Sequence, residues 1–500
     1  MHLIQQHTIN VDCSSQPFGK ELHQQLGGLL EKEFYPKLDL LFEKYECPNQ
    51  IWSIDCLELN LPTISPKNWK NELIQHSLNQ IEAFLQNNKP VVNTNQSRTI
   101  TDNNRLIPKS NFASQLLFQF LVTGTLPENS ISKKLDDVLL AIEISEKFSV
   151  QLIDFFKTNP SRLLRWIMAI PDFFKDKITP KIDLFPFQFK SFFLQVLEEK
   201  TMNLSLNKEA QLQYSKLKKT EILKCFQQDK MFFLLWIELM QWIGVLYLKS
   251  TSKSLLVDEL IRLSKTHWNI NVSDLIQFFN WVETVSVQLQ NDTSTNQTEY
   301  LKEIKKQLTS SQDQQFPIEQ DCNETKKGTN NSSDFYFISN SGLVVFHPFL
   351  QPLFEQLNLI KDGNWKNNQS QHKAVLLTQY LVTGTTTFFE NELVLNKILC
   401  GLPIEDVVNI KQKITKKEKE KCQNLLEAVL EYWTSMSKSS IEALRETFLI
   451  REGKLDVSNS TSYELWVEEK GYDILLAQLP WGIGMIKTPW MNEFLTCHWN

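Results

Sequence analysis

The feature that most constrains this chain is a series of apolar residues at helical spacing between residues 340 and 403. Residues that recur every three or four positions lie on one face of an α-helix. Three such runs are present: Leu350, Leu353, Phe354 and Leu357; Ala374, Leu377 and Leu381; and Leu393, Leu395, Ile398 and Leu399. Gly384 and Gly401 follow the second and third runs, where a glycine commonly ends a helix. The stretch therefore predicts three short helices that each face a core.

Part of this pattern occurs twice. Residues 119–125 read QFLVTGT and residues 379–385 read QYLVTGT. A Glu-Asn pair follows each copy, at 128–129 and at 390–391, and an apolar helical run comes next. Both copies are typical of a helix, a glycine stop, a short turn and a second helix. Two copies indicate an internal duplication of a helical hairpin, whereas a solenoid needs at least about three.

The scarcity of glycine favours helices over hairpins. The chain has 14 glycines in 500 residues, under half the usual ~7%, and a fold with many β-hairpin turns would need more. The 32 Phe and 13 Trp residues supply large side chains for burial, and the length indicates two or three domains. We predict a mainly α fold, with multi-helix domains and a few short β-strands near the N- and C-termini.

Those strands are predicted from alternating patterns at both ends of the chain. Residues 2–13 alternate loosely, and residues 51–61 alternate with a change of face, so the simplest arrangement pairs these two segments. Residues 463–467 alternate between apolar and polar side chains, and residues 494–499 form a last short apolar run. Each end of the chain is thus expected to carry a small strand element.

Two polar stretches suggest the domain boundaries. Residues 86–105 and 290–334 are rich in polar residues and hold too few large apolar groups to offset the entropy cost of ordering. The predicted organisation is an N-terminal α+β region at 1–85, a polar linker at 86–105, a helical domain at 106–289, a disordered linker at 290–334, and a C-terminal α-rich domain with terminal strands at 335–500.

Residues 231–248, which read MFFLLWIELMQWIGVLYL, are nearly long enough to span a bilayer. Glu238 and Gln241 lie in the middle, and a carboxylate is costly at the centre of a membrane. The favoured interpretation is therefore the central buried helix of a large helical domain. The alternative interpretation is that residues 231–248 contact a membrane.

The sequence contains none of the common motifs for catalysis, nucleotide binding or metal binding. No two of the eight histidines are three or four residues apart, so no helical metal pair exists. His347 and Cys400 are the remaining catalytic candidates, and a structural role is favoured for both, since Cys400 ends a helix where a thiolate is disfavoured. Glu464 and Glu468 share the solvent face of a predicted strand. We predict no catalytic residue, no metal site and no cofactor, and hence a protein that is not an enzyme.

Charge and cysteine usage bear on partners and compartment. The net charge of −6 gives no electrostatic reason to expect nucleic acid. Eight scattered cysteines, none at CxxC spacing, favour reduced thiols. The first 13 residues lack the basic and apolar segments of a signal peptide. We expect the protein to be cytoplasmic during synthesis and assembly.

The carboxy-terminal half carries a resemblance to a known family. In order, the chain reads GLVVFHPFLQPLFEQL, LLTQYLVTGT, ENELVLNKILCGLP, SIEALRETFLIREGKL and LWVEEKGYDILLAQLPWGIGMIKTPWM. This order resembles the tape measure protein family of phage-tail-like contractile injection systems from Gly342 to the end, with weaker similarity at residues 51–62 and 121–125. The resemblance implies a non-enzymatic structural component, a tape measure governing inner tube length that lies inside the assembled particle.

The partners implied by the resemblance are the inner tube and baseplate or spike proteins of the particle. Nucleic acid and a small-molecule substrate are not expected, and membrane contact is disfavoured. A ruler must be extended, and a fully helical rod of 500 residues would span about 750 Å. Because the glycine stops and helix periodicity are typical of compact domains, the alternative is a globular assembly or baseplate-side factor that binds tube or spike subunits.

Three tryptophans near the C-terminus are the candidate interaction residues. Trp481, Trp490 and Trp499 lie within the last twenty residues, and Pro480 and Pro489 stiffen the same segment. Aromatic side chains of this kind either seal a core or anchor a protein–protein interface. The sequence leaves both interpretations open.

Overall fold

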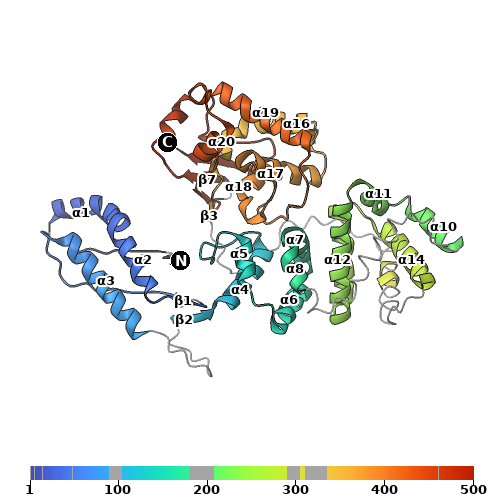
Figure 1. Cartoon of the computed structure of the whole chain (residues 1–500), viewed down its shortest axis with the longest axis horizontal. Coiled ribbons are helices and arrows are strands. Elements are labelled where there is room, and N and C mark those ends of the chain that lie inside the picture. The colour runs from blue at the N-terminus through green and yellow to red at the C-terminus, as the bar shows by residue number, and fades with distance from the viewer. Residues whose placement is uncertain are drawn as a thin grey trace. The chain divides into compact units, whose positions relative to one another are not determined.

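A computed structural model describes most of the chain, namely residues 2–4, 6–13, 15–47, 49–88, 104–178, 208–289, 304–309, 335–459 and 461–499. These residues are mainly helical, with short strands in the N- and C-terminal parts, so the predicted fold class is confirmed (Figure 1). The chain divides into two compact units, Met1–Leu116 with Asn129–Glu143 and Leu117–Glu128 with Ile144–Asn500. The predicted linkers fall largely outside the described residues.

The N-terminal unit begins with a long helical run. It comprises α1 (Gln16–Leu29), a π-helical turn η1 (Leu30–Phe34) and α2 (Tyr35–Glu43), and α3 (Trp69–Asn87) packs against α2. Pro36 lies in the first turn of α2, directly after the π turn. Because proline has no N–H to donate, the regular ladder cannot pass through it. The regular α-helical hydrogen-bond pattern is therefore interrupted next to Pro36.

One predicted strand pairing in this unit is wrong. β1 (Gln50–Ile54) pairs antiparallel with β2 (Asn104–Pro108), and Ile51 stands opposite Ile107. No described residue between 2 and 13 is in a strand, and residues 55–61 are also outside any strand. Most side chains of residues 2–13 are exposed. The alternation there is therefore not matched by burial, which is what fixes a strand in a sheet.

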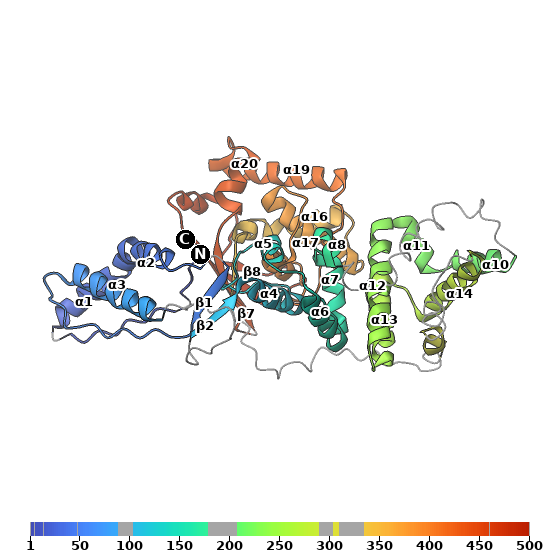
Figure 2. The same ribbon diagram turned by 60° about the horizontal axis from the view of Figure 1, so that its bottom comes forward.

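The second unit contains a group of helices that we call the central helices. They are α6 (Glu146–Thr158), α7 (Leu163–Ala169), α8 (Asp172–Ile178), α10 (Lys208–Leu217), α11 (Glu221–Gln228), α12 (Lys230–Lys249), α13 (Lys253–Trp268) and α14 (Val272–Leu289). The helix α12 packs against α6, α7, α11 and α13 (Figure 2). Trp242 of α12 meets Phe156 and Trp166 with ring centroids 5.4 and 5.5 Å apart.

By length and composition alone α12 is a candidate membrane span, yet 67% of its apolar window is buried inside the fold. Glu238 in the middle of α12 accepts a 2.8 Å hydrogen bond from the Lys175 Nζ of α8. Here α12 is therefore a core helix whose one acidic side chain is paired.

Residues 335–499, which we call the C-terminal block, contain all three helices predicted between residues 340 and 403. These are α16 (Leu350–Gln356), α17 (Asn368–Thr383) and α18 (Val394–Leu399). Gly384 and Gly401 follow α17 and α18 with φ of +71° and +65°, in the left-handed region that favours glycine. Both predicted glycine stops are confirmed.

A five-stranded sheet joins the two ends of this block. Its order is β3 (Phe335–Ile338), β6 (Gly453–Asp456), β7 (Ser462–Val467), β9 (Phe494–His498) and β8 (Met485–Ile486), and only the β7–β9 pair is parallel. Leu465 and Val467 of β7 are buried while Trp466 between them is exposed. The strands predicted at 463–467 and 494–499 are both present.

The remaining helices of the block begin at polar caps. Thr415 and Glu418 form a capping box that opens α19 (Lys416–Tyr432). The helix α20 (Ile441–Leu444) begins after Ser440, whose hydroxyl accepts from the Ala443 N–H. A π-helical turn, η7 (Arg445–Leu449), continues α20.

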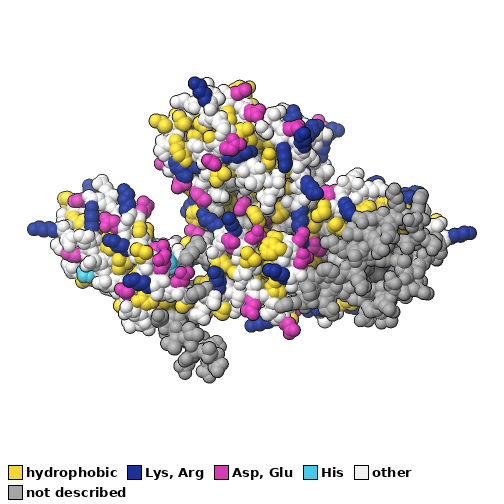
Figure 3. Space-filling view, in the orientation of Figure 1, with side chains coloured by type: hydrophobic (Ala, Val, Ile, Leu, Met, Phe, Trp, Pro, Cys, Tyr) yellow, Lys and Arg dark blue, Asp and Glu magenta, His cyan; other side chains and the backbone are white. Residues whose placement is uncertain are grey.

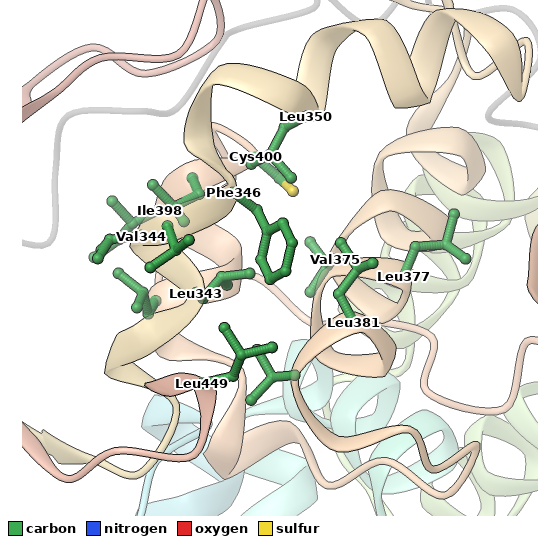
Figure 4. Close-up of a cluster of buried hydrophobic side chains, with 14 of the residues drawn as sticks. Leu343, Val344, Phe346, Leu350, Val375, Leu377, Leu381, Ile398, Cys400 and Leu449 are labelled. Atoms are coloured by element: carbon green, nitrogen blue, oxygen red, sulfur yellow. The ribbon is translucent and has the colours of Figure 1, made fainter. Parts of the chain in front are cut away.

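The core of the C-terminal block is made from its own residues. Every buried side chain in this hydrophobic cluster lies between Ile338 and Trp499. The 3₁₀ segment η4 (Ser341–Phe349) supplies its centre, and Figure 4 shows Phe346 directed toward Val375 of α17. A Cβ on Gly342 would lie 1.9 Å from the Phe448 carbonyl oxygen, so glycine allows η4 and η7 to approach.

Candidate docking site of the C-terminal block

A buried arginine lies where the first LVTGT copy ends its helix. Arg165 of α7 is completely buried, and its Nη1 donates to the carbonyl oxygens of Leu121 and Val122 at 2.8 and 2.9 Å. These carbonyls are at the end of α4 (Lys109–Thr123), whose last C=O groups have no partner within the helix. Gly124 follows with φ +79°, and a Cβ there would lie 2.9 Å from Arg165 Nη2.

The same arginine pairs with a carboxylate of the C-terminal block. Arg165 Nε lies 3.2 Å from Glu390 Oε2, and Lys397 Nζ lies 2.9 Å from Glu390 Oε1. All three side chains are at most 1% exposed. Lys397 also donates to the Ile404 carbonyl oxygen at 2.8 Å, and Arg165 Nη2 donates to the carbonyl oxygen of Glu405. One buried carboxylate thus bridges two buried cations.

Burial has consequences for protonation in this cluster. It lowers the pKa of Lys397, because desolvation outweighs the attraction of Glu390. It also raises the pKa of Asp406 nearby, although Lys397 acts in the opposite direction. Removing one member of such a group leaves an uncompensated charge in a dry environment, which costs about 3–5 kcal/mol.

A second ion network joins the same two parts of the chain. Lys411 Nζ of the C-terminal block lies 2.7 Å from Asp172 Oδ1 of α8, and Lys175 Nζ lies 3.2 Å from the same oxygen. Lys175 continues to Glu238 of α12. Burial alone would raise the pKa of Asp172, but its bonds to Lys411 and Lys175 lower the pKa to about 2.

The contact between the C-terminal block and the central helices is thus rich in ion pairs. The hydrophobic cluster of the block contains no residue of the central helices, while α7 and α8 contribute Arg165 and Asp172 to the two networks. Ion pairs require good geometry and add little net stability when buried, yet they fix how two parts fit together. We call this contact the docking site.

Comparison with known proteins identifies the chain. The family model described as contractile injection system tape measure protein matches residues 1–499. The chain belongs to that family. Searches of curated proteins and of solved structures found no match. Since the matching family model covers the chain almost from end to end, the tape measure family relationship includes the N-terminal unit as well as the C-terminal half that shows the resemblance.

Two of the candidate tryptophans of this tape measure family member are half-buried. The Trp481 Nε1 donates to the Val345 carbonyl oxygen at 3.0 Å, and its ring meets Phe349 at 4.8 Å. The Trp490 Nε1 donates to the Gly363 carbonyl oxygen at 3.1 Å, and its ring lies 4.6 Å from Trp365. Both indoles thus attach the C-terminal segment to the rest of the C-terminal block. That their exposed parts also contact a partner protein stays a prediction.

The third candidate, Trp499, is buried beside a salt bridge. The two carboxylate oxygens of Asp473 accept from Arg451 Nη1 and Nη2 at 2.8 and 2.7 Å, and Trp499 Nε1 donates to Oδ2 at 3.1 Å. The guanidinium also lies 5.2 Å from the Trp499 ring centroid. Burial would raise the pKa of Asp473, but these donors lower it. Trp499 thereby ties the last strand to the rest of the fold.

The two other candidate side chains occupy structural positions. His347 Nδ1 lies 2.9 Å from the Val344 carbonyl oxygen within its own 3₁₀ segment. Figure 4 shows the Cys400 side chain among the apolar residues of the core near Leu350 and Phe346, and burial raises the pKa of this thiol. Among the described residues, no group of His, Cys, Asp or Glu side chains is arranged to hold a metal ion.

Sequence reasoning missed the charged residues of the docking site. Arg165, Glu390 and Lys397 are far apart in sequence, and charged residues are usually exposed. One signal was available, since Glu390 belongs to the Glu-Asn pair that follows the second repeat copy. Aligning the two copies draws attention to that pair, although its partner Arg165 emerges only from the fold.

Proposed function

We propose that this chain acts as the tape measure that governs the inner tube length of a contractile injection particle. Its direct neighbours would be the inner tube proteins along its length and baseplate or spike proteins at one end. The match of the family model to residues 1–499 carries this proposal. A structural component needs no catalytic group, and we propose no enzymatic activity, nucleic acid partner or cofactor.

The charge distribution agrees with protein partners. On the face drawn in Figure 3, basic and acidic side chains of the described residues are interspersed, without a large patch of one sign. Binding to nucleic acid depends on clustered positive charge. We propose that the protein is made and folded in the cytoplasm and then becomes part of the particle.

A compact chain must open before it can act as a ruler. The chain can open at the docking site, because the C-terminal block has a hydrophobic core of its own. Separating that block from the central helices would break the Arg165–Glu390 and Lys411–Asp172 pairs without exposing the core of the block. The docked state would then precede assembly, and tube subunits would add along the opened chain.

Electron microscopy of particles tests the ruler directly. Duplicating residues 290–334 should lengthen the tube by about 70 Å if the added segment is helical, and by about 150 Å if it is extended. Deleting the same residues should shorten the tube correspondingly. As a control, a single-residue insertion at the same place should leave tube length essentially unchanged while retaining assembly.

The compact, self-contained core of the C-terminal block favours a second candidate function, a globular assembly or baseplate-side factor. That factor would bind tube or spike subunits without spanning the tube. If tube length stays fixed in the duplication and deletion variants while particles still form, the ruler proposal is wrong. Mass spectrometry of purified particles adds a second criterion, since a ruler stays inside the tube and a transient factor is absent.

A further inference from the structure

The two repeat copies share a helix-capping arginine as well as a glycine. In the second copy, Arg445 donates from Nε to the Leu381 carbonyl oxygen at 3.1 Å and from Nη2 to that of Tyr380 at 3.4 Å. A Cβ on Gly384 would lie 2.7 Å from Arg445 Nη1. In the first copy, Arg165 caps the matching Leu121 carbonyl oxygen, but through Nη1, and a Cβ on Gly124 would lie 2.9 Å from its Nη2.

Sequence around the arginines supports their equivalence. Each follows a leucine and precedes an isoleucine five residues later, in the segments 164–170 and 444–450. The threonines before the glycines also match, because Thr123 and Thr383 each donate to the carbonyl oxygen four residues earlier at 3.0 Å. The duplicated unit therefore extends from the LVTGT helix to the arginine that caps it.

The copies differ in what each arginine holds. Arg165 is buried and binds Glu390, which comes from the Glu-Asn pair of the second copy. Arg445 is only half-buried. Its guanidinium lies 5.9 Å from the Tyr380 ring centroid, and within the described part of the chain its Nη1 makes no hydrogen bond and it pairs with no carboxylate. The second copy thus repeats the cap and lacks the acidic partner.

The first copy has the complementary difference. Its own Glu-Asn pair begins with Glu128, the sequence counterpart of Glu390. Glu128 is exposed, and no ion pair joins it to another described residue. The connection from the glycine to this glutamate is two residues shorter than in the second copy. Among the described residues of one chain, therefore, Arg445 has no glutamate partner and Glu128 has no arginine partner.

We propose that Arg445 of one molecule binds Glu128 of a second copy of this chain. The intermolecular pair would be the counterpart of the contact between Arg165 and Glu390, made through the Nη1 of Arg445 because its Nε already caps Leu381. A guanidinium held by helix-end carbonyls is oriented to receive a carboxylate in a charge-assisted hydrogen bond. Because each molecule contributes two different surfaces, the contact is head-to-tail and adds further copies in a row.

This association goes beyond the proposed function and does not depend on it. A ruler and an assembly factor could both associate in this way, and failure of either proposal leaves the other standing. If the chain is a ruler, the number of copies in the row becomes part of the length that it specifies. The pair is half-exposed, so salt should weaken it.

Sedimentation velocity of the full-length protein over a range of concentrations tests the pair. The wild-type chain should form concentration-dependent oligomers that dissociate in high salt. Arg445→Glu and Glu128→Arg should each weaken association at least about 10-fold, equivalent to about 1.4 kcal/mol. The double variant, in which the two charges are exchanged, should regain most of the lost association. Lys438→Glu and Glu143→Arg, which make charge changes of the same sign at exposed positions elsewhere, should associate like the wild type.

A mixture of the two single variants gives the sharpest result. Each variant alone should associate weakly, whereas the mixture should associate, because every contact between unlike molecules brings opposite charges together: Arg445 with Glu128 at one junction and the exchanged charges at the next. Glu128 is exposed, so its variant keeps the test valid even if Arg445→Glu unfolds. A wild-type chain that stays monomeric would overturn the proposal. So would association that is unaffected by Glu128→Arg, or a double variant that does not recover.

Discussion

Buried arginines decide the local geometry at several points of this fold. Arg165 and Arg451 are completely buried. Each donates hydrogen bonds to helix-end or loop carbonyl oxygens and also pairs with a carboxylate. A guanidinium offers five donors in a fixed plane, so one side chain can orient several groups at once. Single residues thus hold together segments that are distant in sequence.

The capping arginines make a prediction about the glycines beneath them. Gly384 and Gly363 both have positive φ, but a Cβ on Gly384 would collide with Arg445, whereas nothing lies within 4 Å of a Cβ on Gly363. Gly363→Ala should therefore cost only the left-handed strain of about 1–2 kcal/mol. Gly384→Ala should cost about 1–2 kcal/mol more, because the guanidinium must move. Urea unfolding gives both values, and equal losses would contradict the steric contribution of Arg445.

A buried histidine predicts a pH dependence of stability. The backbone N–H of Asn409 donates to His372 Nδ1 at 3.3 Å, and burial, followed by the charge of Lys397, lowers the His372 pKa to about 4. Between the unfolded pKa near 6.5 and the folded value, the unfolded chain binds more protons. The free energy of unfolding should therefore fall as pH drops through this window, by up to about 3 kcal/mol.

The matched variant is His372→Asn, whose amide oxygen can still accept from Asn409 but does not titrate. Urea unfolding at pH 7 and pH 5 should show a smaller pH dependence in the variant than in the wild type. An unchanged dependence would show that His372 is protonated equally in both states. His267 has its pKa lowered to about 3, first by burial, so the variant should keep part of the dependence.

At the scale of elements, α12 shows how a very apolar helix is accommodated. Trp236, Trp242 and Tyr247 lie on a helix that is surrounded by other helices, and its neighbours supply the apolar partners that a membrane would otherwise offer. The one acidic residue in its middle, Glu238, is satisfied by Lys175. Packing and pairing together explain why such a sequence lies in the interior.

The pair between α8 and α12 can be tested by replacing one or both partners. Glu238→Leu alone should destabilise the protein by about 3 kcal/mol, because Lys175 is left buried without its main carboxylate. Lys175→Met together with Glu238→Leu should recover most of this loss, since two apolar side chains can pack in place of the pair. Thermal unfolding measures both effects. A double variant no more stable than Glu238→Leu would contradict the explanation.

At the scale of the whole molecule, the interior of the C-terminal block is apolar, whereas its contact with the central helices is rich in ion pairs. The C-terminal block closes its core with its own residues, and its contact with the central helices includes the ion pairs of Arg165 and Lys411. Hydrophobic cores unfold cooperatively, whereas a buried ion pair adds little net stability, because both charges regain their hydration when the two parts separate. The docking site is therefore where we expect this molecule to separate first.

Independent folding of the C-terminal block is the corresponding prediction. A fragment of residues 335–500 should show a single cooperative unfolding transition, because its hydrophobic cluster needs no other part of the chain. Glu390 and Lys397 would still pair with each other in the fragment. Circular dichroism and two-dimensional NMR are suitable measurements. A fragment without a cooperative transition would show that the docking site contributes to folding of the block.

Local patterns in the sequence predicted most elements and few of their contacts. The helices around Gly384 and Gly401, and the strands at 463–467 and 494–499, follow from periodicity and stop residues, which act over a few positions. The spacing of Ser439 and Glu442 is that of a capping box and predicts a cap at Ser439. That prediction is wrong by one residue, because Ser440 directly precedes the helix. Ser439 and Ser440 have the same side chain, so only the backbone conformation decides which of them caps the helix.

The sequence alone determined the helical fold class, the duplicated helix with its glycine stop, and the family resemblance, because each depends on the order of nearby residues. The tertiary structure alone decided that β1 pairs with β2, that Arg165 holds Glu390, and that Arg445 has no such partner among the residues that the structure describes. Long-range pairs depend on which surfaces meet after the elements have formed. Similar local sequences can therefore acquire different partners, as the two copies in this chain do.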